Sequence, residues 1–213
     1  MSEVSSEANG NYWDDFYSCI QVGAPTYPSQ FAAFAINEFS GVDGVIEFGC
    51  GNGRDSDFFA AHGFNLLAVD ASVEAIELCQ ARNRFHHAKF VQSRSVDVRE
   101  EVAAFLVGRS RVAVYARFFL HAVEESEERA LLDLLGTLLP SGSRLFLEYR
   151  TIEDADQEKV FGDGHFRRYL DHRAVLGRIE SVGFRVEYEV EGRGFAKYGE
   201  EDALVGRCVV VKG

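Results

Sequence analysis

The feature that most constrains the fold is an alternation of short apolar runs with amphipathic segments along most of the chain. Apolar runs bounded by turn residues predict buried strands, and segments with apolar residues at three-and-four spacing predict helices. Strands that alternate with helices are typical of a parallel sheet covered on both faces, so we expect an α/β fold. The seven predicted strands are Gly44–Phe48, Leu66–Asp70, Ala88–Gln92, Arg111–Tyr115, Ser143–Tyr149, Phe184–Val190 and Val205–Lys212.

Helices are predicted between most of these strands, and two more precede the first strand. The first of these two is NYWDDFYSCI and the second is PSQFAAFAINEF, where Pro28 suits the first turn. No helical pattern separates the last two strands, so we expect them to pair antiparallel across a long loop. The helices between the other strands are predicted at Asp55–His62, Val73–Arg82, Val98–Val107, Ser126–Leu138 and Asp171–Val182.

Length and composition indicate one domain. A chain of 213 residues with 46% hydrophobic composition supports one sizeable core. We therefore expect a single domain over residues 1–213, with residues 1–40 as an N-terminal helical cap. Residues 151–170 and 191–204 are predicted to be inserts on the side of the acceptor substrate.

The same composition limits compartment and partners. No apolar run is long enough to cross a membrane, and the N-terminus MSEVSSEANG is too polar for a signal peptide, so we expect a soluble, cytoplasmic protein. The four cysteines form no C-x-x-C pair, which predicts reduced, mostly buried thiols and no metal site. A net charge of −12 disfavours a nucleic-acid partner. We expect a monomer or a homodimer.

The stretch VIEFGCGNGRDSDFF predicts a ligand-binding turn between the first strand and its helix. Gly49, Gly51 and Gly53 permit positive φ and a close approach of backbone to a ligand, next to unpaired N–H groups at a helix start. The spacing is G-x-G-x-G followed by Arg54, which departs from the G-x-G-x-x-G of dinucleotide enzymes. Glu47 would repel a pyrophosphate and suits an amine-bearing or cationic ligand.

Acidic residues follow three successive strands. Asp70 is placed to accept hydrogen bonds from ribose hydroxyls, and Asp97 in SVDV could accept from an adenine amino group. Together with Glu47, they indicate a nucleoside with a cationic, amino-acid-like tail. Two alternatives stay open: the glycines form only a tight turn, or Asp70 caps the next helix, a role that Ser72 could also fill.

This pattern resembles the class I S-adenosylmethionine-dependent methyltransferases. The motifs that carry the resemblance are VIEFGCGNG, LLAVDAS, SVDV, RVAVYARFFLHAV and LLPSGSRLFLEY. The resemblance implies a Rossmann-like sheet of seven strands with an antiparallel last strand, and S-adenosyl-L-methionine bound over the first strand ends. It places Glu47, Gly49 and Gly51 at the methionine part of the donor, Asp70 at the ribose, and Asp97 with the Val98 backbone at the adenine.

Further contacts with the donor are expected from side chains around these motifs. Arg54 is either a donor contact or a first-turn helix residue. Tyr115 stands where many members of the family carry Asp. The aromatic residues of the first helical segment are either core contacts or a cover over the donor. The complete set of additional donor-binding candidates is Tyr12, Trp13, Gly53, Arg54, Ala71 and Tyr115.

The acceptor should be bound by polar residues at the later strand ends. Methyl transfer needs in-line placement and desolvation more than covalent chemistry. Convergent guanidinium groups would bind a carboxylate, phosphate or phosphonate. The catalytic candidates are His121, Arg117 and His165, of which either histidine could act as a base for a hydroxyl acceptor. The acceptor-binding candidates are Tyr17, Arg117, Glu148, Arg150, His165, Arg167, Lys197 and Tyr198.

Structural alternatives exist for several of these residues. Arg117 could pair with Glu148 or contact the donor carboxylate, His121 could buttress the helix that follows, and Arg168 could be a surface charge.

The resemblance favours O-methylation of a small anionic metabolite or saccharide. The alternatives are an N-methyltransferase acting on a small amine and a non-catalytic S-adenosylmethionine-binding protein. A nicotinamide oxidoreductase is disfavoured because Arg54 stands where the G-x-G-x-x-G motif of dinucleotide enzymes has its last glycine. The chain has no N/D-P-P-Y motif, which argues against methylation of nucleic-acid bases.

Overall fold

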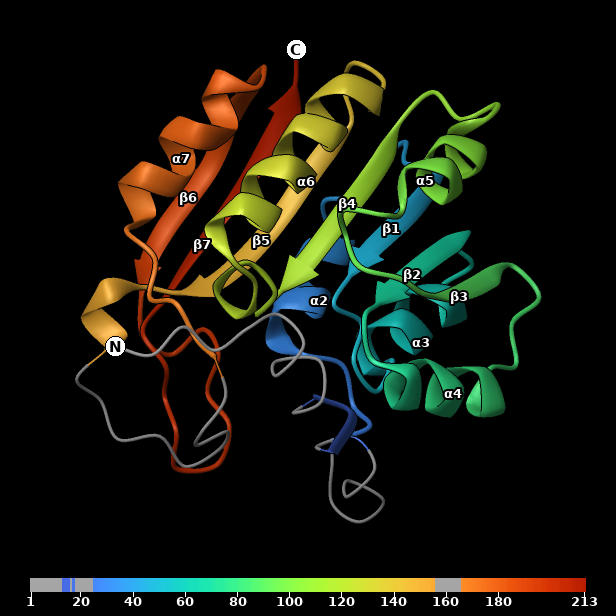
Figure 1. Ribbon diagram of the computed structural model, residues 1–213, viewed down its shortest axis with the longest axis horizontal. Helices are drawn as coiled ribbons and strands as arrows, with labels where there is room; N and C mark the ends of the chain where they lie inside the picture. Colours follow the sequence, from blue (N-terminus) through green and yellow to red (C-terminus); the bar gives the residue numbers. More distant parts are fainter. Residues whose placement is uncertain (1–12, 16, 18–24, 156–165) are drawn as a thin grey trace.

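The computed structural model describes residues 13–15, 17, 25–155 and 166–213, and it contains one seven-stranded sheet (Figure 1). The strand order is β3-β2-β1-β4-β5-β7-β6. β7 is antiparallel to both of its neighbours, whereas the pairs β1–β2, β1–β4, β2–β3 and β4–β5 are parallel. This arrangement confirms the predicted Rossmann-like sheet with its antiparallel last strand.

The strands closely follow the sequence pattern. β1 (Gly44–Phe48), β2 (Leu66–Asp70), β3 (Ala88–Gln92) and β7 (Val205–Lys212) have the predicted bounds. β4 (Val112–Arg117), β5 (Arg144–Arg150) and β6 (Phe184–Gly192) each extend beyond the predicted end. In β4 the extension occurs because Ala116 and Arg117 pair in register with β5. Both Arg117 and Arg150 therefore end a strand at the carboxyl edge of the sheet.

The helices between strands also lie where they were predicted, with small shifts at their ends. They are α3 (Arg54–Ala61), α4 (Val73–Arg82), α5 (Arg99–Leu106), α6 (Glu125–Leu138) and α7 (His172–Ser181). Short 3₁₀ turns follow β4 and β5, namely η1 (Leu120–Ala122) and η2 (Ile152–Asp154). Among the helices of the described ranges, none is both long and apolar enough to cross a membrane.

The helix before β1 is shorter than expected. α2 spans Gln30–Ile36, and Ser29 caps it by accepting a hydrogen bond from the Ala32 amide. The prediction that Pro28 occupies the first turn is therefore wrong, because the helix begins two residues after Pro28. Its N-cap is Ser29, whose hydroxyl can accept from a free backbone N–H, which a proline side chain cannot do. Within the predicted first segment, residues 13–15 and 17 are helical.

The two faces of the sheet carry separate apolar cores. α5, α6 and α7 pack with residues such as Ile46 and Val114 on one face, while α2, α3 and α4 pack with Val45 and Ala113 on the other. Every residue of β1 is buried, as expected for a parallel strand covered on both sides. The carboxyl ends of β1 and β4 point toward the lower part of Figure 1, where the start of α2 and the β6–β7 loop lie.

A buried polar network joins α2, α3 and β4. Asp55 accepts hydrogen bonds from the Ser29 amide (2.7 Å), the Ser29 hydroxyl (2.7 Å) and the Tyr115 hydroxyl (2.8 Å). Tyr115 has no exposed surface and packs on Phe31 and Phe59. The predicted contact of Tyr115 with the donor is therefore corrected, because this ring supports the helices from within the core.

We expect Tyr115→Phe to lower the free energy of unfolding by about 1–2 kcal/mol, because buried Asp55 loses one donor. Urea denaturation measures the change. Tyr27→Phe is the matched control, since Tyr27 is exposed. Equal stability of the Tyr115→Phe variant and the wild type would contradict the structural role of this hydroxyl.

Candidate functional site

The turn between β1 and α3 has a backbone that only glycine adopts readily. Gly49, Gly51 and Gly53 have φ values of 71°, 53° and 74°. A Cβ built on Gly51 would lie 2.4 Å from the Tyr17 hydroxyl, and one on Gly53 would lie 2.7 Å from the Cys79 sulfur. The turn thus lets other groups approach its main chain closely.

Asp70 connects the end of β2 to this turn. One carboxylate oxygen accepts from the Gly51 amide (2.8 Å) and the other from the Ser72 amide (3.0 Å). Ser72 itself caps α4 through the Ala75 amide (3.2 Å), so the capping role belongs to Ser72 and not to Asp70. Burial raises the pKa of Asp70. Each oxygen retains capacity to accept a further hydrogen bond from a ligand hydroxyl.

A carboxyl group and a guanidinium flank the turn. Glu47 is buried and accepts a hydrogen bond of 2.5 Å from the Ser56 hydroxyl. Burial, followed by the nearby Asp55, raises the pKa of Glu47 well above its usual value. Arg54 begins α3 with a side chain that is 16% exposed, and its Nε lies 4.0 Å from Asp55. A buried acid and a confined guanidinium suit the ammonium and carboxylate of an amino-acid tail.

The first helical segment covers the turn. Tyr17 lies over Gly51, and burial raises the pKa of Tyr17 well above its usual value, with Asp70 as the next contribution. Its ring stacks on Trp13 at 6.1 Å, and Asp14 accepts a hydrogen bond of 2.6 Å from the Ser72 hydroxyl. Tyr17 was expected at the acceptor; its place above the glycine turn assigns it to the donor side instead.

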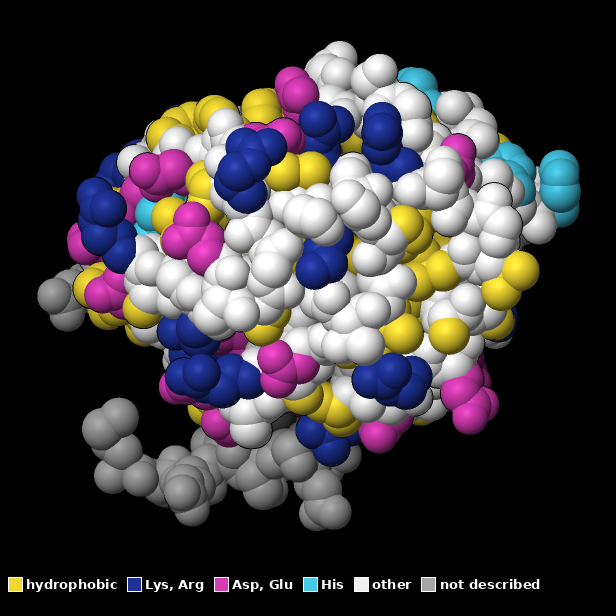
Figure 2. Space-filling view, turned by 90° about the horizontal axis from the view of Figure 1, so that it is seen from above, with side chains coloured by type: hydrophobic (Ala, Val, Ile, Leu, Met, Phe, Trp, Pro, Cys, Tyr) yellow, Lys and Arg dark blue, Asp and Glu magenta, His cyan; other side chains and the backbone are white. Residues whose placement is uncertain are grey.

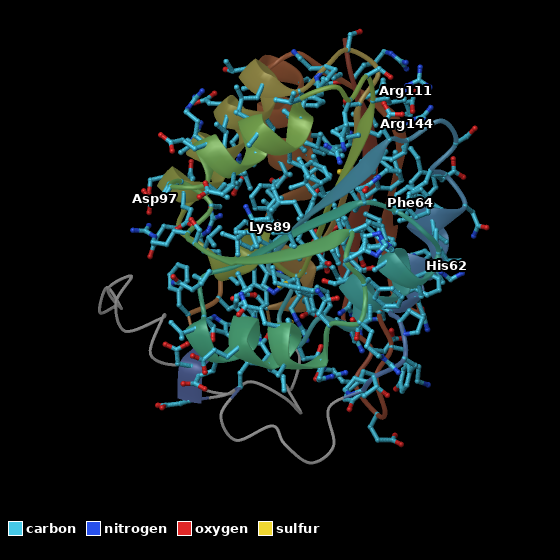
Figure 3. The ribbon with its side chains drawn as sticks, turned by 90° about the vertical axis from the view of Figure 1, so that its right-hand side faces the viewer. His62, Phe64, Lys89, Asp97, Arg111 and Arg144 are labelled. Carbon is cyan, nitrogen blue, oxygen red and sulfur yellow. The ribbon has the colours of Figure 1, made fainter. Side chains whose placement is uncertain are left out.

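The residues expected at the adenine end lie beyond β2 and β3. Asp97 is exposed, Val98 is fully buried where α5 begins, and the Ala71 carbonyl accepts from the Gln92 side chain (2.9 Å). In Figure 3, Asp97 lies away from Arg111 and Arg144, which are at the opposite edge of the sheet. Contacts of these three residues with a donor stay predictions, as does that of Tyr12, which is outside the described residues.

Buried ion pairs dominate the expected acceptor side. Glu148 has no exposed surface and lies between Arg117 (Nε to Oε1, 2.9 Å) and Arg207 (Nε to Oε2, 2.5 Å). The prediction that Glu148 binds the acceptor is therefore wrong, because both of its oxygens are occupied by guanidinium groups. The alternative pairing of Arg117 with Glu148 is confirmed.

Arg150 is similarly engaged. It is buried and pairs with Asp154 at 2.6 Å and with Glu201. Asp154 also accepts from the Leu204 amide (2.9 Å), and Arg207 donates to the Phe195 carbonyl (2.6 Å). The predicted acceptor-binding role of Arg150 is corrected: its guanidinium fastens the β6–β7 loop to the sheet.

His121 contacts the main chain through its ring. The Arg150 amide donates to its Nδ1 at 3.0 Å, and the imidazole is buried. An amide can only donate, so Nδ1 holds a lone pair and the proton of the neutral ring is on Nε2. A base acting through Nε2 needs the other tautomer. The structure therefore contradicts the predicted catalytic base and favours the alternative in which His121 buttresses η1 against β5.

The remaining candidates divide between interior and rim. Arg168 is no free surface charge: it donates to the fully buried Glu128 (2.6 Å), to which Arg178 also donates (2.7 Å). Lys197 is exposed, and Arg167 and Tyr198 are half-buried. His165 lies outside the described residues.

Sequence reasoning missed Arg207 and Phe118. Arg207 neutralises Glu148 from a strand whose pattern indicated only an apolar interior, and its guanidinium lies 5.0 Å from the Phe31 and Phe195 ring centres. Phe118 stands directly after β4 with a φ of 56°. A charged residue within VGRCVVV was the one available signal for Arg207, whereas nothing in the sequence signals the conformation of Phe118.

One protein-family model matches most of the chain. A family model described as a methyltransferase domain matches residues 26–188, which is most of the chain. The chain belongs to this methyltransferase family. No curated protein matches the methyltransferase in sequence.

Solved structures with the same fold are distant in sequence. A SAM-dependent methyltransferase from Anabaena variabilis has a TM-score of 0.69 at 16% identity, with 96% of this chain and 95% of that chain covered. A TehB-like SAM-dependent methyltransferase from Corynebacterium glutamicum has a TM-score of 0.61 at 18% identity, with 98% of this chain and 100% of that chain covered. The glycopeptide N-methyltransferase MtfA, complexed with S-adenosyl-L-methionine, has a TM-score of 0.64 at 16% identity, with 91% of this chain and 99% of that chain covered.

The raised pKa of Glu47 predicts a pH-dependent stability. The folded chain holds this proton more tightly than the unfolded chain, so the corresponding stability is present at low pH and is lost as pH rises toward the raised pKa. Glu47→Gln should therefore raise the free energy of unfolding by about 1–3 kcal/mol at pH 8 and by less at pH 5.

Urea denaturation of the Glu47→Gln variant at both pH values measures this difference. Glu38→Gln is the control, because Glu38 is exposed. A gain that is the same at pH 5 and pH 8 would show that Glu47 carries no such linkage.

Proposed function

We propose that this methyltransferase uses S-adenosyl-L-methionine to methylate an oxygen of a small anionic metabolite or saccharide. The donor fits the residues of the turn. The Glu47 carboxyl can accept a hydrogen bond from the ammonium of the methionine part and the Arg54 guanidinium can donate to its carboxylate, the main chain at Gly51 accommodates a close approach, and Asp70 can accept from ribose hydroxyls. When bound, the donor supplies an electrophilic methyl group on a sulfonium.

The observation that carries the proposed acceptor is the setting of Arg117. Its Nε is bound to Glu148, and no other ion pair links it to a described residue. Its side chain is 17% exposed at the carboxyl end of β4, beside β1 and the glycine turn. A guanidinium held through Nε keeps two terminal nitrogens for a carboxylate or phosphate, in fork geometry.

The residues of this chain then act by placement. Arg117 orients the acceptor, the fastened β6–β7 loop limits its size, and Tyr17 with Trp13 excludes water from the donor. An anionic acceptor oxygen needs no base. This suits the tautomer of His121, whose Nε2 is protonated and can donate.

A second candidate is N-methylation of a small amine, which is favoured by the fold similarity to MtfA, a glycopeptide N-methyltransferase. A third is donor binding without catalysis. We also propose action in the cytoplasm without a nucleic-acid or membrane partner. Three described cysteines are free and buried, and Figure 2 shows basic and acidic side chains interspersed on the face it presents.

The donor assignment is tested by Gly51→Ala. The added Cβ would meet the Tyr17 hydroxyl at 2.4 Å on a backbone with positive φ. We expect affinity for S-adenosylhomocysteine, measured by calorimetry, to fall at least about tenfold, which corresponds to about 1.4 kcal/mol. Gly63→Ala is the matched control, because Gly63 also has positive φ but no atom lies near its built Cβ. Equal affinities of the two variants would show that the donor does not bind at this turn.

The acceptor assignment is tested by Arg117→Gln in a screen of phosphorylated and carboxylated compounds with labelled donor. With an acceptor found in the screen, KM for the acceptor should rise about 10- to 100-fold, as expected for a lost charged hydrogen bond. Donor affinity should change little. Arg129→Gln is the control, since Arg129 forms an exposed pair with Glu125.

Mass spectrometry of the methylated product distinguishes the candidates. Methyl on oxygen supports the proposal, methyl on nitrogen supports the second candidate, and donor binding without turnover on any compound supports the third. An unchanged acceptor KM in Arg117→Gln would exclude Arg117 from acceptor binding.

A further inference from the structure

Phe118 has an unusual backbone conformation at the carboxyl end of β4. Within the described ranges it is the one non-glycine residue with positive φ, at 56°. A bulky side chain in this region is strained and persists only where its surroundings fix it. Such strain is concentrated at functional sites, so the contacts of Phe118 indicate what the strain maintains.

The left-handed conformation brings the Phe118 ring onto its neighbour. In an extended strand, successive side chains point to opposite faces, so Arg117 and Phe118 would be kept apart. Here the Arg117 guanidinium carbon lies 4.2 Å from the centre of the Phe118 ring. The Phe118 amide donates to the Glu148 carbonyl at 2.8 Å, which fixes the main chain where it leaves β4.

Arg117 is therefore held by two different groups. Glu148 binds Nε at 2.9 Å, and the guanidinium carbon lies over the Phe118 ring. Glu148 is itself fixed by Arg207 from β7. A guanidinium with its Nε bound and its carbon over an aromatic ring loses most of its rotational freedom, while its terminal nitrogens stay available.

We propose that Phe118 is a positioning residue that orients Arg117 for the acceptor anion, and that its strained backbone is maintained for this contact. The inference rests on the proposed function for the identity of the anion, but not for the contact itself. The competing explanation is that the ring only fills the small apolar cluster of the β6–β7 loop, formed by Ala196, Ala203 and Val205.

The test compares Phe118→Leu with Phe118→Tyr in the full chain saturated with S-adenosylhomocysteine. Leu keeps apolar bulk for the loop cluster but removes the aromatic face, whereas Tyr keeps the face. Calorimetric affinity for S-adenosylhomocysteine serves as the check that both variants fold. The first readout is the NMR resonance of the Arg117 Nε–H group, assigned by its loss in Arg117→Lys.

In Phe118→Leu we expect the ring-current shift of this resonance to disappear and its exchange with water to speed up roughly three- to tenfold, whereas Phe118→Tyr should match the wild type. The same exchange rate in Phe118→Leu and the wild type would overturn the inference. If Phe118→Leu fails to fold, Phe118→Met takes its place, because Met also keeps apolar bulk without an aromatic ring: faster exchange than in the wild type supports the inference, and wild-type exchange rejects it.

The second readout is a titration with inorganic phosphate, followed on the same resonance. Its apparent Kd should rise roughly three- to tenfold in Phe118→Leu. If phosphate leaves Arg117 unperturbed in the wild type while the exchange readout behaves as expected, the anionic acceptor of the proposed function is wrong and the positioning role of Phe118 stands.

Comparison of Phe118→Gly with Phe118→Ala tests the strain independently. Both variants lose the ring, but only glycine relieves the left-handed conformation. We expect Phe118→Gly to unfold at higher urea concentration than Phe118→Ala. The reverse order would show that the backbone at this position is not strained.

Discussion

The sharp turn after β1 is the constraint on which the site depends. Three residues in the left-handed region reverse the chain within five positions, and Asp70 ties the turn to the end of β2 through the Gly51 amide. The strand order reverses between β1 and β4, and the helices that follow these two strands, α3 and α6, pack on opposite faces of the sheet, so the loops after β1 and β4 diverge at its carboxyl edge. Only glycine allows the main chain to lie so close to what enters there.

Charged side chains are distributed differently on the donor side and the acceptor side of the candidate site. On the donor side, Glu47, Asp55 and Asp70 are buried or half-buried, and Arg54 lies near Asp55. On the other side, Glu148 and Glu128 are each shared by two arginines. Burying charges in this way is expensive unless they are paired, and each acid there is fully paired. The result is a donor side rich in carboxyl groups and an acceptor side on which the buried carboxylates Glu148 and Glu128 are paired with arginines.

The sequence predicted the sheet well because its information is local. Apolar runs such as those of β1, β2 and β3 are bounded by turn residues, so their limits followed directly from the pattern. Which charged residues pair with one another was much harder to predict from the sequence. Glu148 and Arg207 are far apart in the chain and meet only because β5 and β7 are neighbours in the sheet. Arginines that looked available for an anion were therefore largely neutralised by acids that no local pattern places beside them.

Two other features depend on tertiary structure in the same way. Tyr17 belongs to a helical pattern that does not indicate what its side chain contacts, and only the structure shows that its hydroxyl lies over Gly51. The tautomer of His121 is set by the Arg150 amide, a main-chain group that is common to all sequences except at proline. The sequence thus predicted which residues lie at the carboxyl edge of the sheet, whereas their hydrogen-bond and ion-pair partners became clear only from the structure.

The fastening of the β6–β7 loop has a consequence for selectivity. Arg150, Asp154 and Arg207 anchor this loop at three separate points, to Glu201, to the Leu204 amide and to the Phe195 carbonyl. A wall that is already ordered loses little conformational entropy when a molecule arrives beside it. Discrimination between compounds of different shape at this wall then comes from steric fit to a preformed boundary, and a misfitting compound is rejected without the loop having to refold around it.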